Sequence, residues 1–163
     1  MYLSRLIYYS RIILDSADRG AFKEIKKILG ETAQHNEEAG ITGGLLFNQT
    51  YFAQAIEGDR KAVTETFTSM MSDSRHQDVV ILEARPIEKR RFLTWNMGFA
   101  GKTEFAKQLY VKYGASEAFD PGKMTADSLL GFIEEIITEE DALGKMFGVT
   151  TKTQGKTPAY AST

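Results

Sequence analysis

The chain has 163 residues, a formal net charge of −2 and a pI of about 5.8. A chain of this size is expected to form one domain with a short extension, and it can bury a substantial core. The near-neutral charge gives no reason to expect nucleic acid or an anionic membrane as a partner. Cysteine is absent and only two histidines occur, which excludes disulfides and a thiol nucleophile and argues against a His-rich metal site.

The N-terminus carries Arg5 and Arg11 in an alternating, strand-like pattern and lacks the apolar segment of a signal peptide. No apolar run approaches the length of a membrane span. We therefore expect a cytoplasmic protein whose partners include neither a membrane nor nucleic acid.

Residues 2–9 are rich in β-forming side chains, and both of their alternating faces are largely apolar. This pattern predicts a central strand that is covered on both sides, with Leu6 and Tyr8 on one face. From Ala21, apolar residues recur at helical spacing in a stripe that ends at Asn36. Asn36 has two open interpretations: an amide that caps the helix end, or a polar contact to a pocket.

A hairpin is predicted from two β-rich runs, 41–47 and 51–56, which are joined by residues 48–50. Gln54 then shares one face with Phe52 and Ile56. A buried amide that lacks a partner costs about 1–3 kcal/mol, so a polar group is expected against this face. The alternative is an edge strand in which Gln54 faces water.

A second helix is predicted after the capping residue Asp59, and its core side holds Val63, Phe67, Met70 and Met71. Three polar residues follow its end: Asp73, Arg75 and His76. A helix end favours cations, so Arg75 and His76 can bind the last carbonyls, whereas Asp73 gains nothing from the helix dipole.

Residues 79–84 form the next predicted strand, 86–91 a basic turn and 92–100 a last strand, on which Trp95, Met97 and Phe99 share one face. Aromatic residues at this spacing are usually core, and whether Trp95 points in or out stays open. The order βαββαββ predicts a ferredoxin-like α+β domain over residues 1–101, with two helices on one face of the sheet. Such a pair of helices can hold a flat ligand between them.

A helical extension is predicted for residues 102–149. It contains a helix at 105–113, a connection rich in helix breakers at 114–123 and an amphipathic helix at 125–137. The apolar side of the last helix needs a partner, which is the sheet face, another subunit or both. Residues 150–163 have too little apolar surface to fold and are expected to be disordered.

Six sequence blocks occur in an order and spacing that resembles the BLUF family of blue-light flavin photoreceptors: RLIYYS, HNEEAGITGGLLF, FAQAIEG, DSRH, PIEKRRF and WNMGF. The resemblance covers roughly residues 2–100. A further segment, VKYGASEAFDPGKMTADSLLGFIEEI, is similar to the two-helix appendage of the short, PixD-like members.

The resemblance implies a photochemical switch. Tyr8 matches the family tyrosine that donates an electron and a proton to the photoexcited flavin. Gln54 matches the glutamine that bridges this tyrosine and the N5/O4 edge of the flavin and rearranges after light. Trp95 and Met97 match two residues of the last strand that compete for the place beside the glutamine.

The resemblance also implies the flavin contacts. Asn36 matches the amide at the O4/N3 side of the ring, and Asp73, Arg75 and His76 fall in the block near its pyrimidine end. Ser69 departs from the family, because many members place a longer basic or hydrogen-bonding side chain there, toward the flavin O2. The contacts at this end are therefore expected to depend on water or on Arg75.

Family members bind FAD non-covalently, and FMN or riboflavin can also occupy the site. No Gly-rich phosphate loop is present, so the diphosphate and adenine are expected to be loosely held. As no catalytic domain is encoded in these residues, we expect signalling through a separate output protein, either response-regulator-like or a cyclic-dinucleotide enzyme, and a homo-oligomer.

Two other hypotheses for the function stay open. One is a small ferredoxin-fold enzyme, such as an acylphosphatase-type phosphatase or a flavin reductase, although neither a phosphate loop nor a dinucleotide fingerprint is present. The other is a light-insensitive interaction module, against which the retained Tyr8 and Gln54 argue. A yellow protein whose flavin band shifts reversibly to the red under blue light would separate the sensor from both.

Overall fold

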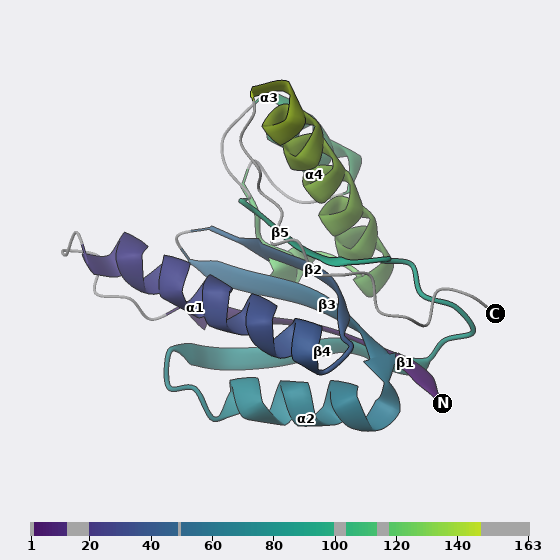
Figure 1. The fold of residues 1–163 in the computed structure, drawn as a ribbon. Coiled ribbons are helices and arrows are strands. Elements are labelled where there is room, and N and C mark those ends of the chain that lie inside the picture. The colour runs from purple at the N-terminus through teal and green to yellow at the C-terminus, as the bar shows by residue number, and fades with distance from the viewer. Residues whose placement is uncertain (1, 13–19, 49, 100–103, 114–117, 148–163) are drawn as a thin grey trace.

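The computed structural model describes residues 2–12, 20–48, 50–99, 104–113 and 118–147 (Figure 1). Its elements are β1 (Leu3–Ile12), α1 (Gly20–Glu38), β2 (Thr42–Phe47), β3 (Tyr51–Asp59), α2 (Arg60–Met71), β4 (His76–Pro86), β5 (Trp95–Phe99), α3 (Glu104–Lys112), the short 3-10 helix η1 (Pro121–Lys123) and α4 (Ala126–Phe147). The predicted βαββαββ order and the ferredoxin-like α+β class are confirmed, and the C-terminal extension adds α3, η1 and α4.

The strands form one five-stranded sheet in the order β4-β1-β3-β2-β5. β1 runs antiparallel to both β3 and β4, and β2 is antiparallel to β3 but parallel to β5. β1 and β3 therefore lie in the interior of the sheet. The prediction of a central first strand is confirmed, and the alternative that placed Gln54 on an edge strand is wrong.

The outer strand β4 is irregular. Its pairing with β1 shifts register between Ile7 and Tyr8 and again between Tyr9 and Arg11. Asp78 on β4 has a positive φ of 50°, a conformation uncommon outside glycine. Val80 and Ile81 are exposed on the same strand.

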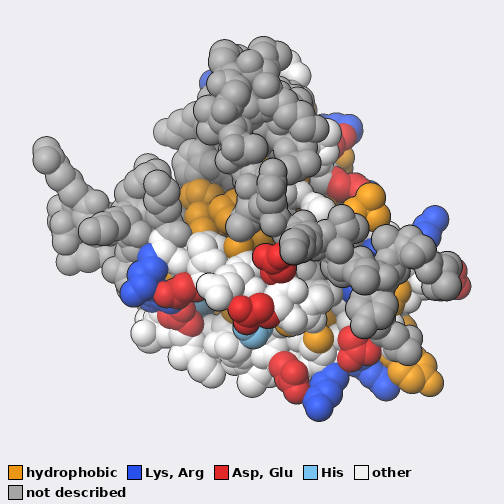
Figure 2. Space-filling model, viewed as in Figure 1, with side chains coloured by type: hydrophobic (Ala, Val, Ile, Leu, Met, Phe, Trp, Pro, Cys, Tyr) orange, Lys and Arg blue, Asp and Glu red, His pale blue; other side chains and the backbone are white. Residues whose placement is uncertain are grey.

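Helices α1 and α2 lie together on one face of the sheet (Figure 1). Leu29 and Ala33 from the predicted apolar stripe of α1, together with Ile28, pack with Phe52 and Trp95 from the strands. A second cluster lies under α2 and joins its Val63, Phe67 and Met70 to Leu6, Tyr8, Ile41 and Ile56. The outer surface of α1 and α2 is mostly polar, with acidic side chains and a histidine among them (Figure 2).

Helix α4 covers the opposite face of the sheet. It extends ten residues beyond the end of the predicted helix, and all six of its predicted apolar residues are buried: Leu129, Leu130, Phe132, Ile133, Ile136 and Ile137. The sheet face is thus a partner of this helix. Contact is close, because a Cβ on Gly44 of β2 would lie 2.4 Å from the Cγ2 of Ile133.

Three predictions differ from the structure or lie outside it. Met71 does not belong to the core, since it is exposed at the end of α2, one position past the apolar stripe. The strand predicted from residue 92 begins at Trp95, and Phe92 lies in the preceding connection, where its backbone N–H binds the side chain of Glu57. The tail predicted at 150–163 lies outside the described residues.

Candidate functional site

Tyr8 and Gln54 form a buried hydrogen-bonded pair between two neighbouring interior strands, β1 and β3. They are direct cross-strand partners on β1 and β3, so their side chains point to the same face, toward α1 and α2. The Tyr8 hydroxyl donates to Oε1 of Gln54 at 2.7 Å and lies 3.0 Å from Sδ of Met70. Burial raises the pKa of the Tyr8 phenol well above its ordinary value. Tyr8 is therefore a protonated hydrogen-bond donor at neutral pH.

Several buried polar atoms on this side of the sheet have no hydrogen-bond partner among the described residues. They are Nε2 of Gln54, Nε1 of Trp95 and both side-chain polar atoms of Asn36. A buried polar group without a partner costs about 1–3 kcal/mol, so such a cluster indicates a ligand that supplies the missing bonds. Because Asn36 lacks a side-chain partner here, the structure gives no support to its interpretation as a helix cap.

A cavity of about 170 Å³ opens between α1 and α2. Its lining residues are Ile28, Glu31, Thr32, His35, Asn36, Thr66, Ser69, Met70, Asp73, Arg75 and His76. Four predicted flavin contacts, Asn36, Asp73, Arg75 and His76, therefore line one cavity, and Ser69 is exposed at its wall.

The residues after α2 form a compact charged unit at this cavity. The Asp73 carboxylate accepts from the backbone N–H of Arg75 at 3.0 Å and from its guanidinium Nε at 2.8 Å. These bonds lower the pKa of Asp73 to about 2. The same guanidinium lies 3.6 Å from Glu31 of α1. Arg75 therefore links the segment that follows α2 to α1 beside the cavity. The wall of this cavity carries the short side chain of Ser69.

His76 is held at the start of β4. Its Nδ1 lies 2.8 Å from Oγ of Ser10 on β1, and its ring packs 5.1 Å from that of Phe52. Burial lowers the pKa of His76, and the nearby Asp73 only partly offsets this effect.

Trp95 and Met97 both point to the face of the sheet that α1 covers, and they pack in the same cluster. Trp95 is buried at 8% exposure, whereas Met97 is only partly buried. Trp95 is therefore the more deeply buried of the two residues on this face.

Two residues of β1 and β3 with buried polar contacts, Ser10 and Glu57, were not predicted from the sequence. Ser10 faces the same side as Tyr8, two positions along β1, so strand alternation could have found it. Glu57 is fully buried on β3. A carboxylate within an otherwise apolar strand, three residues after Gln54, was the available signal.

The described residues contain no group of three or more His, Asp or Glu side chains that could hold a metal ion. Among the described helices, none has both the length and the apolar character needed to cross a bilayer.

The family model described as "Sensors of blue-light using FAD" matches residues 3–98. The chain belongs to the BLUF family.

Similar proteins agree with this assignment. The "Blue light- and temperature-regulated antirepressor BluF" of Escherichia coli is 31% identical over 121 residues, which cover 74% of this chain. The chain spans only 28% of the length of that relative. The solved structure of "BlrB - a BLUF protein" in its dark state is 34% identical, covers 68% of this chain and 80% of its own, and has a TM-score of 0.58.

A second solved structure, "BlsA photo-activated state", has a TM-score of 0.70 and covers 83% of this chain and 94% of its own. Its identity is 24%, so this similarity supports the fold alone.

The BLUF site residues present here fit a flavin. The isoalloxazine edge carries both hydrogen-bond donors and acceptors, and the orphaned amides of Asn36 and Gln54 offer both kinds of group. The apolar side chains around them suit a flat aromatic ring.

Proposed function

We propose that this BLUF domain senses blue light through a non-covalently bound flavin, with the Tyr8–Gln54 pair as its switch. FAD, which the family description names, is the expected cofactor, and FMN or riboflavin can take the same site. The observation that carries the proposal is the orientation of Gln54. Its Oε1 is taken by the Tyr8 hydroxyl, while its buried Nε2 has no partner among the described residues.

The proposed chemistry of the switch follows from these contacts. When bound, the flavin supplies the absorption of blue light and an electron-accepting ring. Tyr8 would donate one electron to that ring and release its phenolic proton toward Gln54. The amide of Gln54, 2.7 Å from the hydroxyl, is the first acceptor of that proton. Gln54 then settles with a different set of hydrogen bonds, and this rearranged amide is the signal.

The remaining site residues hold the ring. Asn36 binds its O4/N3 side, and Asp73, Arg75 and His76 line the pyrimidine end. Arg75 takes over the contact for which Ser69 is too short. Met97 and Trp95 pack beside Gln54, and the change from one neighbour to the other accompanies the switch.

The output leaves through the C-terminal extension. Light alters the packing of residues 125–137 against the sheet, and this change acts on a homo-oligomer or on a separate response-regulator-like protein or cyclic-dinucleotide enzyme. A few rearranged hydrogen bonds limit the coupling to about 1–3 kcal/mol, or roughly a 5- to 150-fold change in partner affinity.

The test is the absorption spectrum of the purified protein before and after blue light. We expect a yellow protein whose flavin band shifts to the red and recovers in darkness. A colourless protein would favour the phosphatase alternative, and bleaching on addition of a nicotinamide reductant would favour a flavin reductase. A bound flavin with no red shift would indicate a light-insensitive interaction module.

A further inference from the structure

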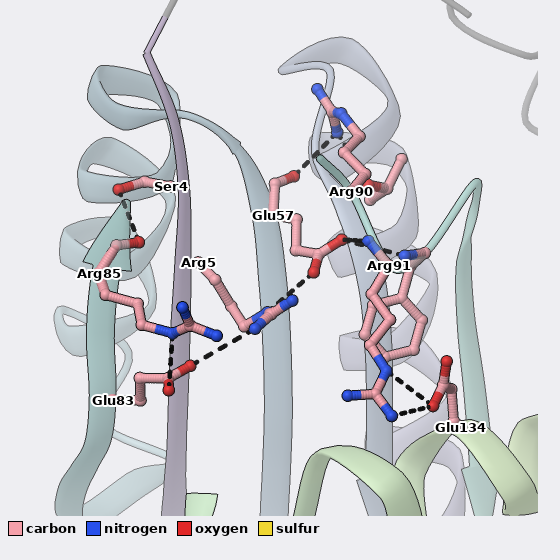
Figure 3. A network of polar contacts seen from close by, with 10 residues as sticks. Ser4, Arg5, Glu57, Glu83, Arg85, Arg90, Arg91 and Glu134 are labelled. Atoms are coloured by element: carbon pink, nitrogen blue, oxygen red, sulfur yellow. Dashed lines mark hydrogen bonds and ion pairs between the residues drawn. The ribbon is translucent and has the colours of Figure 1, made fainter. Parts of the chain in front are cut away.

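Glu57 is a fully buried carboxylate that joins three segments of the chain (Figure 3). Its Oε1 accepts from Nε of Arg5 on β1 at 2.9 Å. Its Oε2 accepts from the backbone N–H groups of Arg91 at 2.8 Å and Phe92 at 3.0 Å. Charge-assisted bonds to buried groups are strong and directional. Glu57 therefore fixes the connection between β4 and β5, residues 87–94, to the middle of the sheet.

A second arginine strengthens this attachment. Nη1 of Arg90 donates to the backbone carbonyl of Glu57 at 3.0 Å, to the carbonyl of Gly40 at 3.1 Å and to Oγ1 of Thr42 at 2.8 Å. Residues 87–94 are thus bound to β3 and to the start of β2 together.

The same connection also contacts α4 on the far side of the sheet. The guanidinium of Arg91 binds Oε2 of Glu134, with Nε at 2.8 Å and Nη2 at 2.7 Å. The side chain of Phe92 is buried in the cluster that contains Ile133 and Ile137. Two neighbouring residues that Glu57 holds by their backbones therefore hold α4 by their side chains.

Gln54 and Glu57 lie on one strand but face opposite sides of the sheet. Gln54 points toward α1 and α2, and Glu57 points toward the side of α4, as alternation over three positions requires. A shift or twist of β3 that follows a new hydrogen-bond pattern at Gln54 must move the Glu57 carboxylate as well. The N–H groups of Arg91 and Phe92 are expected to move with that carboxylate, because no other described group accepts a hydrogen bond from them.

We propose that Glu57 is a positioning residue that carries the light-induced change at Gln54 across the sheet to α4. This inference rests on the light-sensing function proposed above and adds the route by which the signal leaves the flavin side. Glu57 has no part in the photochemistry itself.

The arginines near Glu57 have a structural explanation in this network. A hollow of about 800 Å³ is lined by Arg5, Arg85, Pro86, Ile87, Glu88, Lys89, Arg90 and Arg91. Glu57, Glu83 and Glu134 pair with Arg5, Arg85 and Arg91 respectively. Three of the four arginines that line the hollow are therefore paired with carboxylates.

The test compares two double variants that differ only in an acceptor. Arg5→Met with Glu57→Gln removes the buried charge pair but keeps an amide oxygen for the N–H groups of Arg91 and Phe92. Arg5→Met with Glu57→Leu fills a similar volume and has no acceptor. Hydrogen exchange is measured in darkness and in blue light, and the flavin red shift is recorded for each protein.

We expect both double variants to retain the red shift. The light-dependent change in exchange at residues 126–137 should persist in the Gln variant and be lost in the Leu variant. A structural role alone would raise exchange equally in darkness and light, so a Leu variant with the wild-type light-dependent difference overturns the inference.

A second pair of variants tests the outer link even if the buried variants do not fold. Glu134→Ala removes the acceptor that Arg91 binds, whereas Glu135→Ala removes a comparable ion pair to Lys112 of α3. We expect a smaller light response of α4 in Glu134→Ala only. Equal responses in the two variants overturn the inference. A wild-type protein with a red shift but no change at 126–137 also overturns it, whereas a wild-type protein without a red shift refutes the proposed function itself.

Discussion

The hydroxyl of Tyr8 donates to Oε1 of Gln54 from the position directly opposite it on the neighbouring strand. Both residues are almost completely buried, at 1% and 0% exposure. This bond fixes the orientation of the Gln54 amide, because a protonated phenol can donate only to the amide oxygen, Oε1. The NH2 group of Gln54 is then directed to the remaining space.

Tyr8→Phe should abolish the red shift while flavin remains bound. The phenyl ring fills nearly the same volume, so packing against Phe67 persists, but the transferable proton is lost. The unpaired Gln54 oxygen should lower the free energy of unfolding by about 1–3 kcal/mol. Absorption spectra and denaturation curves check both effects. A full, reversible red shift in this variant would rule out Tyr8 as the donor.

Gln54→Ala should bind flavin with an altered dark spectrum and show no reversible photocycle. One amide makes the bond to Tyr8 and is proposed to make the bond to the flavin, so its removal deletes both. Gln34→Ala is the matched control, because Gln34 is an exposed amide of α1 whose Nε2 donates to Oε1 of Glu38 on the same helix. If Gln54→Ala cycles like the wild type, the switch lies elsewhere and Asn36 becomes the next candidate.

Asn36→Leu should raise the free energy of unfolding of the flavin-free protein and weaken its binding of flavin. The side chain is fully buried, and neither of its polar atoms has a partner within the described part of the chain. Without flavin, an apolar residue of similar size should raise the free energy of unfolding by about 1–3 kcal/mol. The same change should weaken flavin binding in a titration. Unaltered flavin affinity would exclude Asn36 as a contact to the ring.

His76 should make the protein less stable as the pH falls below about 6.5, the ordinary pKa of histidine. Its folded-state pKa is lowered by burial, so below that pH the unfolded chain binds a proton that the folded chain excludes. The stabilisation is complete above pH 6.5 and is lost as the pH falls toward the folded-state pKa. Denaturation curves at pH 7.5 and 5.5 should differ less in His76→Gln. An unchanged pH dependence in that variant would contradict the assignment.

Gly44→Ala should loosen α4 without disturbing the photochemistry. The added methyl group would lie 2.4 Å from Cγ2 of Ile133 and 2.5 Å from Cδ1 of Ile137, so these side chains must shift and their packing against the sheet is disturbed. Overpacking of this kind costs about 1–3 kcal/mol of stability. Gly30→Ala on α1 is the control, since a Cβ there meets nothing within 4 Å. Loss of the red shift in Gly44→Ala, with α4 still packed, would contradict this prediction.

The faces of the site residues could be predicted from the sequence because strand alternation is a property of the backbone. Tyr8 and Gln54 were each assigned to a face correctly on that basis. Their pairing could not be predicted, because residue spacing does not determine which strands are neighbours or in what register. The known family was needed to connect them.

Phe92 shows a different limit. Its aromatic side chain and β-rich neighbours favoured a strand, but its N–H is bound by the carboxylate of Glu57, 35 residues earlier in the chain. The Phe92 N–H thus binds a side-chain carboxylate where a strand residue would bind the backbone carbonyl of a neighbouring strand. The local sequence pattern carries no information about such a distant acceptor. Trp95 was ambiguous for a related reason, since its direction depends on how the connection before β5 is held.

The irregular outer strand bears on how copies of the protein behave at high concentration. Two register shifts and the positive φ of Asp78 interrupt the row of hydrogen-bonding groups that β4 would otherwise present to another chain. The opposite margin of the sheet, β5, is only five residues long. Neither margin is a good template for continuous growth of the sheet, so this fold resists fibril formation by strand addition. The helix-covered faces, and not the sheet margins, are then the surfaces left for any contact between copies.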